Sequence, residues 1–414
     1  MMLWLTIACR NLFRNHRRSL FTILAIGFGF AGVTLFSGFV HYISSSLRDM
    51  QIYGRAGGHL TVLKKNWNAP GAIEEEASFT DEETALIEKV LAEEPNVVAV
   101  SPGTGLSAIL SNGEASSICY GFGISPSTVE RIRNTARGLL GEFRYYEGDP
   151  LSDEKSYGIG ISRGLRRALD LKLGDSVVLA GPTADGQFNA VDCEVLQIFE
   201  TTGDQSDRSL LVPIEHVRRL RNSYGAQQFG VLLREGVSLP DMRKQLTDRL
   251  AAEGIQVEIF TWEEMSHFYR RVRDMFNVIN RFNLVIVLVI AGMSVINTIG
   301  MAVMERTREI GTLRALGLKP RGVLVLFALE SALIGLCGTG LGVLLLLAGW
   351  LGMDIAKPTW IPPQINVEVP LQVHLVPEYI VLCAVGVVTL AVLAALIASR
   401  RAARMEVVDA LGHS

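Results

Sequence analysis

Four long apolar segments constrain this chain more than any other feature of its sequence. They cover residues 20–42, 282–303, 323–353 and 379–399. Each is at least as long as the roughly 20 residues with which an α-helix crosses the core of a bilayer. The first, second and fourth segments contain no Asp, Glu, Lys or Arg, and the third contains only Glu330. These segments predict four transmembrane helices and exclude an ordinary soluble enzyme.

Basic residues in the short flanking segments predict the orientation of the helices. Lys and Arg cluster in residues 1–19, 304–322 and 400–414, whereas the loop over 354–378 carries only Lys357. Residues 43–281 hold 26 Lys and Arg against 34 Asp and Glu, a net charge of −8, and are long enough to form a core of their own. We therefore expect a multi-pass protein of the inner membrane with both termini in the cytoplasm and one large domain outside.

The segment over 43–281 has the pattern of a mixed α/β domain. Thr80 and Glu83 form a capping box that predicts a helix over 81–94, and Ser162 is a candidate N-cap for a helix over 163–169. Strands are predicted at 97–100, 176–179, 192–199, 209–212, 231–233 and 257–259, and further helices at 213–220, 239–253 and 263–280, the last continuing into the second span. The predicted fold is therefore a four-helix membrane protein with an α/β domain between the first two helices, divided into two lobes near residues 105–160. For Cys119 and Cys193, a disulfide and two separate buried thiols remain open alternatives.

Sequence motifs exclude several chemistries. A phosphate-binding loop needs a Gly-Lys pair, and none occurs, so we expect no ATP hydrolysis on this chain. The GxGxxG match at 27–32 lies inside an apolar span and predicts close helix packing. The GxSxG match at 160–164 allows a serine nucleophile with His216 or His267, or merely an N-cap at Ser162. Scattered histidines without a CxxC motif predict no metal site, and a net charge of −3 does not suggest nucleic acid binding.

The third span carries most of the informative intramembrane residues. Gly335, Gly338 and Gly342 predict close helix packing, within the chain or across a dimer. Glu330 lies about 10 Å along this helix from its cytoplasmic end, at 1.5 Å per residue. It could bond a neighbouring helix or pair with a flanking Arg. Because the spans otherwise lack Asp, Glu, Lys and Arg, we do not expect a channel for a hydrophilic solute.

The segment over 304–317, with the sequence MERTREIGTLRALG, carries the most specific local pattern. Its apolar residues Ile310, Leu313 and Leu316 predict a short amphipathic helix that lies on the membrane or docks to a protein. The string resembles the signature of the MacB/FtsX permease family, the membrane subunits of ABC systems often called type VII. The segments at 8–18 and 330–332 match the same family's pattern, while those at 173–177 and 199–213 are similar to its lipoprotein-releasing (Lol) branch.

This resemblance implies a coupling helix that binds a separate ABC ATPase, which would hold ATP and Mg while this chain carries no cofactor. The implied coupling residues are Glu305, Arg306, Glu309, Gly311, Arg314 and Gly317. The resemblance also implies a dimer with a second copy or a paralogue, whose outside domains move to act on a lipoprotein, lipid or other amphiphile at the outer face of the membrane. Membrane lipid and a periplasmic adaptor or acceptor are further implied partners. An FtsX-like regulator of cell-wall hydrolases and a MacB-like efflux permease for peptides or macrolides are the alternatives.

Overall fold

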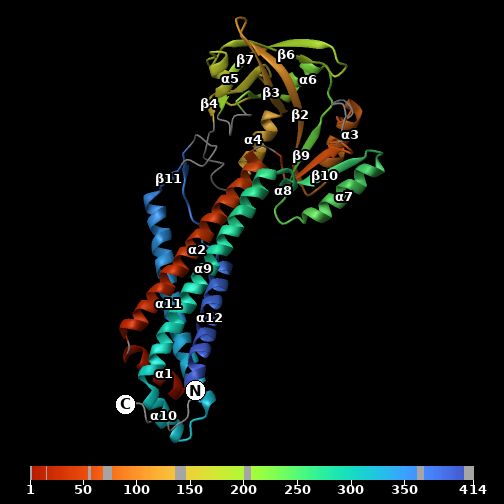
Figure 1. Cartoon of the computed structure of the whole chain (residues 1–414). Coiled ribbons are helices and arrows are strands. Elements are labelled where there is room, and N and C mark those ends of the chain that lie inside the picture. The colour runs from red at the N-terminus through yellow and green to blue at the C-terminus, as the bar shows by residue number, and fades with distance from the viewer. Residues whose placement is uncertain are drawn as a thin grey trace. The chain divides into compact units, whose positions relative to one another are not determined.

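The computed structural model (Figure 1) describes residues 2–14, 16–54, 57–68, 77–135, 146–199, 207–360 and 368–404. Of the sequence positions singled out above, Asn15 and residues 200–206 lie outside the described residues, as does the tail over 405–414. The chain forms two compact units. The helical unit comprises Met1–Ile43, Val272–Pro358 and Pro370–Ser414, and the sheet unit comprises Ser44–Arg271 and Thr359–Val369.

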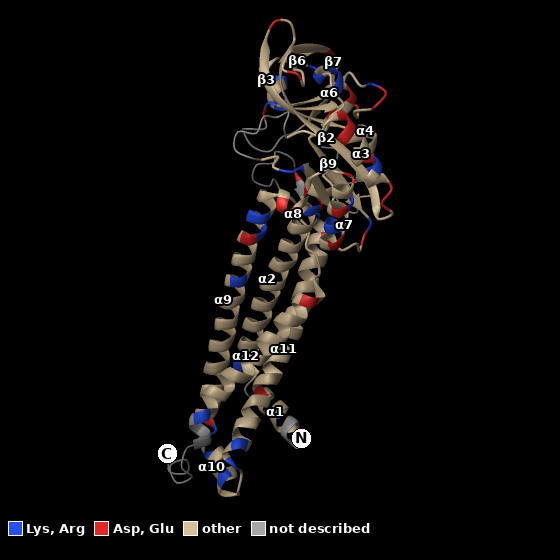
Figure 2. Ribbon diagram, turned by 90° about the vertical axis from the view of Figure 1, so that its right-hand side faces the viewer, with Lys and Arg blue, Asp and Glu red and all other residues tan. Residues whose placement is uncertain are grey.

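Six helices lie wholly or largely in the described part of the helical unit. They are α1 (Met2–Arg14), α2 (His16–Asp49), α9 (His267–Glu305), α10 (Thr307–Ala315), α11 (Pro320–Ala356) and α12 (Pro377–Arg404). The four segments long and apolar enough to cross a membrane are His16–Gly54, His267–Glu305, Pro320–Ala356 and Pro377–Arg400. Figure 2 shows long, mostly uncharged stretches along these helices, with Lys and Arg gathered around α10. The prediction of four helices that are long and apolar enough to span a membrane is therefore confirmed.

Close contacts between α2 and α11 depend on glycine. A Cβ atom at Gly338 would lie 2.5 Å from the side chain of Ile26, and one at Gly342 would lie 2.6 Å from that of Phe30. Gly335 faces α12, because a Cβ there would lie 3.3 Å from the Cα of Val388. The described structure therefore uses all three glycines for helix packing within one chain.

Polar bonds join the same helices to one another. Asn280 of α9 accepts a hydrogen bond from Ser37 of α2 at 2.8 Å and donates one to the Tyr379 hydroxyl of α12 at 2.9 Å. The hydroxyls of Thr22 in α2 and Thr298 in α9 lie 2.6 Å apart. Such bonds stabilise helix association where apolar burial cannot, because lipid tails are as apolar as the side chains.

The sheet unit is built on one ten-stranded sheet. Its strands are β1 (Leu60–Lys64), β2 (Val97–Ser111), β3 (Ser116–Ile124), β4 (Tyr146–Gly148), β5 (Gly158–Ser162), β6 (Ser176–Pro182), β7 (Phe188–Phe199), β8 (Ser209–Pro213), β9 (Gln228–Leu233) and β10 (Val257–Thr261). The strand order is β10-β1-β9-β2-β3-β8-β5-β7-β4, with β6 paired to β2 and β7. Its helices are α3 (Asp81–Ala92), α4 (Pro126–Asn134), α5 (Arg163–Ala168), α6 (Ile214–Arg221), α7 (Leu239–Ala252) and α8 (Trp262–Met265), with a π-helical turn, η1, at Met50–Gly54. The short strands β11 (Thr359–Trp360) and β12 (Val369–Pro370) pair with each other.

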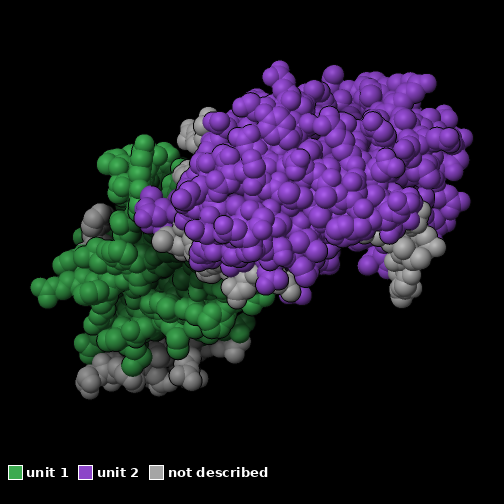
Figure 3. Space-filling view, turned by 90° about the horizontal axis from the view of Figure 1, so that it is seen from above, with its two compact units in different colours: residues 1–43, 272–358, 370–414 green, residues 44–271, 359–369 purple. Residues whose placement is uncertain are grey.

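The two largest apolar cores of the sheet unit define two lobes (Figure 3 shows the unit in purple). The first lobe packs α3 and α7 against β1, β9 and β10, and the second packs α5 and α6 against β3 and β5–β8. The chain enters the second lobe along β2 and returns to the first between Leu220 and Ala226. The first crossing lies along β2, next to the start of the boundary predicted near 105–160, whereas the return between Leu220 and Ala226 was not predicted.

The strand predicted to end at Val100 instead continues to Ser111 as β2. The Pro102-Gly103 pair, which resembles a turn, lies within this strand, opposite Phe229 and Gln228 of β9. From Thr104 onward the strand pairs with β3. A Cβ at Gly103 would lie 2.5 Å from the ring of Phe122, so this glycine allows close packing rather than a change of direction.

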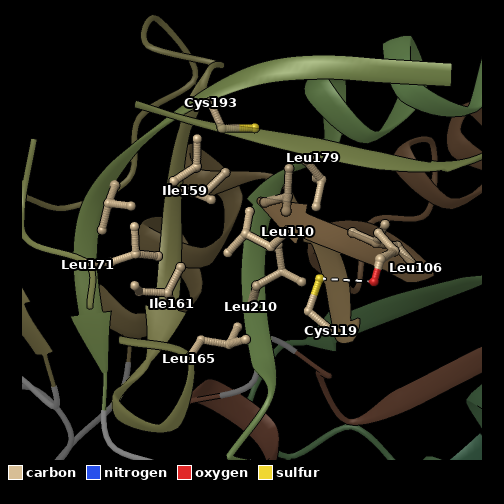
Figure 4. Close-up of a cluster of buried hydrophobic side chains, with 14 of the residues drawn as sticks. Leu106, Leu110, Cys119, Ile159, Ile161, Leu165, Leu171, Leu179, Cys193 and Leu210 are labelled. Atoms are coloured by element: carbon tan, nitrogen blue, oxygen red, sulfur yellow. Dashed lines mark hydrogen bonds between the residues drawn. The ribbon is translucent and has the colours of Figure 1, made fainter. Parts of the chain in front are cut away.

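Both cysteines of the second lobe are free, buried thiols (Figure 4). The thiol of Cys119 donates a hydrogen bond to the carbonyl oxygen of Ala108 at 3.3 Å, and the sulfur of Cys193 lies 3.3 Å from Nε2 of His216. Burial raises the pKa of each thiol to about 12. Of the two open alternatives, the structure has the separate buried thiols.

Candidate functional site

The segment predicted to couple to an ATPase, residues 304–322, is called the coupling segment below and contains the short helix α10. The helix ends at a turn in which Gly317 has a φ of +99°, and the Leu318 amide donates to the Leu313 carbonyl at 3.0 Å. Glycine suits this position because it takes up the left-handed conformation without steric cost. Pro320 then opens α11 at the position where a missing N–H costs least.

Arg306, Glu330 and the half-buried Asn11 form a polar cluster, which we call the clasp. Arg306 lies between α9 and α10, and its Nη1 donates to Oε1 of Glu330 in α11 at 3.0 Å. The side-chain amide of Asn11 in α1 donates to the same carboxylate oxygen at 2.5 Å, while Nη2 of Arg306 donates to the Asn11 carbonyl at 3.3 Å. The charged side chains are only 7% and 6% exposed. Both roles considered for Glu330 are thus present, a bond to a neighbouring helix and an ion pair with a flanking Arg.

Two exposed ion pairs join the coupling segment to α1 and α2. Arg18 of α2 pairs with Glu305 at 2.6 Å, and Arg14 of α1 pairs with Glu309 at 2.8 Å. Their side chains are 43–63% exposed. Exposed ion pairs of this kind contribute only about 0.2–1 kcal/mol each to stability. They therefore help to orient the segment but add little to the stability of its attachment.

The apolar residues of the coupling segment differ in exposure. Ile310 is buried in the core of the helical unit, whereas Leu313 is 43% and Leu316 is 81% exposed. These residues are three positions apart, and three residues turn an α-helix by 300°, which is 60° short of a full turn. Each side chain therefore points about 60° away from the previous one. Ile310 therefore anchors the segment in the core of the helical unit, and Leu313 and Leu316 form an exposed apolar tip.

The six predicted coupling residues have different environments. Glu305, Arg306 and Glu309 make ion pairs inside the chain, and Gly311 is buried. Arg314 is half-buried on α10, and Gly317 is exposed at the turn. Asn11, Arg14 and Arg18 also contact this segment and were not predicted as its partners from the sequence. The presence of Arg and Asn residues before the first span, and of three Glu in or near the coupling segment, is a sequence signal for ion pairs and hydrogen bonds between them, but it does not show which residues pair.

The serine-nucleophile arrangement considered for Ser162 is not assembled. Its hydroxyl donates to the carbonyl of Asp207 at 2.7 Å and caps α5 by accepting from the Leu165 amide at 3.3 Å. His216 instead contacts Cys193 and the carbonyl of Asp192. The N-cap interpretation is therefore confirmed. Among the described residues there is also no cluster of His, Cys, Asp or Glu suited to a metal ion.

Comparison with known proteins gives matches over both parts of the chain. The model of the MacB-like periplasmic core domain matches residues 19–249, and that of the FtsX-like permease C-terminal domain matches residues 281–407. An uncharacterized ABC transporter permease of Methanocaldococcus jannaschii is 26% identical over 355 residues, which are 82% of either chain.

More distant or partial relatives include MacB proteins. The macrolide export ATP-binding/permease protein MacB of Escherichia coli K12 is 29% identical over 186 residues, which cover 44% of this chain and 27% of MacB. The crystal structure of the periplasmic region of MacB from Actinobacillus actinomycetemcomitans covers 52% of this chain and 95% of that region, with 16% identity and a TM-score of 0.36. This chain thus spans about a quarter of the length of the Escherichia coli MacB protein that it matches.

Proposed function

We propose that this chain, which belongs to the family of ABC transporter permeases with a MacB-like periplasmic core domain and an FtsX-like C-terminal domain, transmits ATP-driven movement to its outside domain. In this proposal the ATP and Mg bind to a separate ATPase subunit, since the sequence lacks the Gly-Lys pair of a phosphate-binding loop. Both termini and the coupling segment would lie in the cytoplasm, and the sheet unit on the opposite side of the membrane.

The exposed tip of α10 supports docking to an ATPase. Leu313 and Leu316 are exposed at the end of a short helix that is fixed by the clasp at its other end. Buried apolar anchors supply much of the affinity in protein interfaces, and a leucine that is 81% exposed has most of its surface available for that purpose. The clasp would then carry the resulting force to α1 and α11.

The environment of Glu330 is the observation that most strongly supports a mechanism without a channel. It is the only Asp, Glu, Lys or Arg within the four predicted spans, and its carboxylate accepts hydrogen bonds from Arg306 and Asn11. A hydrophilic solute would need polar groups along its path through the membrane. A lipoprotein, lipid or other amphiphile already in the outer leaflet needs no such path, so we propose this substrate class.

Export of a macrolide or peptide is the second candidate. It is favoured by the match to MacB proteins, whose name records macrolide export. Such export would require a periplasmic adaptor as a further partner.

A substitution at the tip tests the docking step directly. Leu316→Asp should abolish co-purification of an ATPase subunit from native membranes in mild detergent, as followed by mass spectrometry. Leu173→Asp is the matched control, because it makes the same change at a leucine of the sheet unit that is 44% exposed. If the ATPase is retained with Leu316→Asp, or if none co-purifies with the native chain after crosslinking, the proposed coupling is wrong.

The substrate class is tested by release from vesicles. The permease and its ATPase are reconstituted in liposomes that carry a fluorescent triacylated lipopeptide, and the same peptide without acyl chains serves as the control. We expect ATP to drive release of the lipopeptide to a soluble acceptor such as albumin, without transport of the free peptide. Transport of the free peptide or of a macrolide would favour the second candidate instead.

A further inference from the structure

Two histidines that are 333 residues apart in the sequence lie side by side in the helical unit. Nδ1 of His41 is 3.2 Å from Nδ1 of His374, and the two ring centroids are 5.4 Å apart with 57° between the ring planes. His41 is near the end of the first predicted span. His374 belongs to residues 370–376, which lead from β12 into α12 and which we call the strap. With such a separation along the chain, no spacing in the sequence could indicate this pair.

The strap is held against α2 by contacts that position His374. The His374 amide donates to the Gly38 carbonyl at 3.2 Å, and the Tyr42 hydroxyl donates to the Pro370 carbonyl at 2.7 Å. The buried ring of Tyr42 packs edge-on against the His374 imidazole, with 5.5 Å between the ring centroids. A Cβ at Gly38 would lie 2.3 Å from the His374 carbonyl oxygen, so glycine allows this close approach. Gly38, His41 and Tyr42 lie within about one turn of α2, and these contacts therefore fix the His374 imidazole beside His41.

Two imidazole nitrogens at this distance have few possible arrangements. Two lone pairs or two N–H groups that face each other repel, so either one Nδ1 donates a hydrogen to the other or both bind one cation. With Zn–N bonds of about 2.0–2.1 Å, a nitrogen separation of 3.2 Å corresponds to an angle of about 100–106° at the ion, close to the tetrahedral value of about 109°. His41 is exposed, so an ion can reach the pair from outside and the His41 ring can rotate toward it. The observed separation is therefore already that of two ligands of one metal ion.

We propose that His41 and His374 are two protein ligands of a divalent transition-metal site, and that Zn²⁺ is the ion that fits it best. Imidazole nitrogen suits Zn²⁺, Cu²⁺ and Ni²⁺, whereas Mg²⁺ and Ca²⁺ prefer oxygen ligands. The described residues contain no group of three or more His, Cys, Asp or Glu side chains that could hold a metal ion, so the pair is not a closed structural centre. An ion held by two imidazoles keeps positions for water or for a donor atom of another molecule.

A bound ion would tie the strap to α2. Because the strap leads directly into α12 at Pro377, the ion would join the ends of two of the four long helices. The site involves neither the coupling segment nor the clasp. It goes beyond the proposed function, and testing it requires neither an ATPase nor a transport substrate.

Zinc binding to the full chain tests the site. The protein is purified in detergent with an affinity tag that contains no histidine and is titrated with Zn²⁺ in a calorimeter. His41→Ala and His374→Ala should each weaken binding at least about tenfold, since the loss of even an outer-shell contact to a metal ligand costs that much. His267→Ala is the matched control, because His267 is an exposed histidine of α9 that contacts Arg270 instead, and it should leave binding unchanged. The proposal is overturned by a native chain without saturable binding, by unchanged affinity in His41→Ala or His374→Ala, or by an equal loss in His267→Ala.

Hydrogen exchange at the His374 amide separates a shared metal ion from a hydrogen-bonded pair. Zn²⁺ should slow exchange of this amide in the native chain, because the ion holds the strap against α2. His41→Ala removes only an exposed side chain and places a good helix former in α2, so this variant should fold and keep the bond from the His374 amide to Gly38. In His41→Ala, Zn²⁺ should no longer slow the exchange, and Mg²⁺ at the same concentration should have no effect on either protein. If Zn²⁺ leaves the native exchange unchanged, or slows it equally in His41→Ala, the two imidazoles form only a hydrogen bond and the proposal is refuted.

Discussion

Removing the carboxylate of the clasp is the most informative perturbation of this structure. Glu330→Leu leaves the guanidinium of Arg306 in a site where it is only 7% exposed. Arg cannot release its proton to escape the charge penalty. The loss of one partner from a buried ion pair costs about 3–5 kcal/mol, so we expect a loss of stability of that size.

The double variant Arg306→Met/Glu330→Leu should recover part of this loss. Replacing both members of a buried pair by apolar side chains is often neutral or stabilising. Here the half-buried amide of Asn11 would still lose its acceptor; because a fully buried donor costs about 1–3 kcal/mol, we expect a cost near the lower end of that range. We therefore expect the double variant to be more stable than Glu330→Leu and less stable than the native chain.

Equilibrium unfolding in detergent measures the stability of the native chain, of Arg306→Met, of Glu330→Leu and of the double variant, which together form a double-mutant cycle. Glu309→Leu is the matched control, because it breaks an ion pair whose side chains are 63% and 49% exposed and should cost only about 0.2–1 kcal/mol. If the effects of Arg306→Met and Glu330→Leu simply add, or if Glu309→Leu is as damaging as Glu330→Leu, the reasoning about the clasp is refuted.

Three further predictions concern other parts of the chain. Gly338→Ala should destabilise the helical unit by about 1–3 kcal/mol through overpacking against α2, whereas Gly340→Ala, with no neighbour within 4 Å of the added Cβ, should not; thermal unfolding in detergent compares them. Burial lowers the pKa of His59, whose Nδ1 accepts from the Leu233 amide at 3.1 Å. As the pH drops, the unfolded chain therefore binds the proton before the folded chain does, and stability should fall below about pH 6.5. Protection of the Leu233 amide from hydrogen exchange should fall with it, and His59→Asn should reduce this pH dependence. Cys193, with a thiol pKa of about 12, should resist iodoacetamide at pH 8 until the protein is unfolded, and rapid alkylation of the native protein would contradict its burial.

Local signals in the sequence predicted the features that depend on a few adjacent residues. The capping box at Thr80 and Glu83 is present with both of its hydrogen bonds, and Ser162 caps α5. The long apolar runs identified the four helices because crossing a membrane requires a length and composition that few other structures share. These inferences needed no knowledge of distant contacts.

Features that depend on distant partners could not be predicted in the same way. Pro102 and Gly103 have the local pattern of a turn, and only the position of β9 and of the Phe122 ring accounts for a strand there. Asn11 and Glu330 are separated by 319 residues in the sequence, so no periodicity or spacing links them. The sequence showed that Glu330 needed a partner, because an unpaired charge in a span is costly, but several flanking Arg residues could equally have supplied it.

The contacts of the coupling segment divide into strong and weak attachments, and this division bears on how it could transmit force. Arg306 lies at the junction of α9 and α10 and is held by a buried ion pair with α11, whereas Glu305 and Glu309 make only exposed pairs with α2 and α1. A push on the tip at Leu316 can therefore rearrange the exposed pairs at a cost of about 1 kcal/mol or less each. The clasp resists separation several times more strongly. We therefore expect α10 to tilt about Arg306 and to carry α1 and α11 with it, so that substitutions in the clasp should uncouple ATP hydrolysis from transport more severely than substitutions in the exposed pairs.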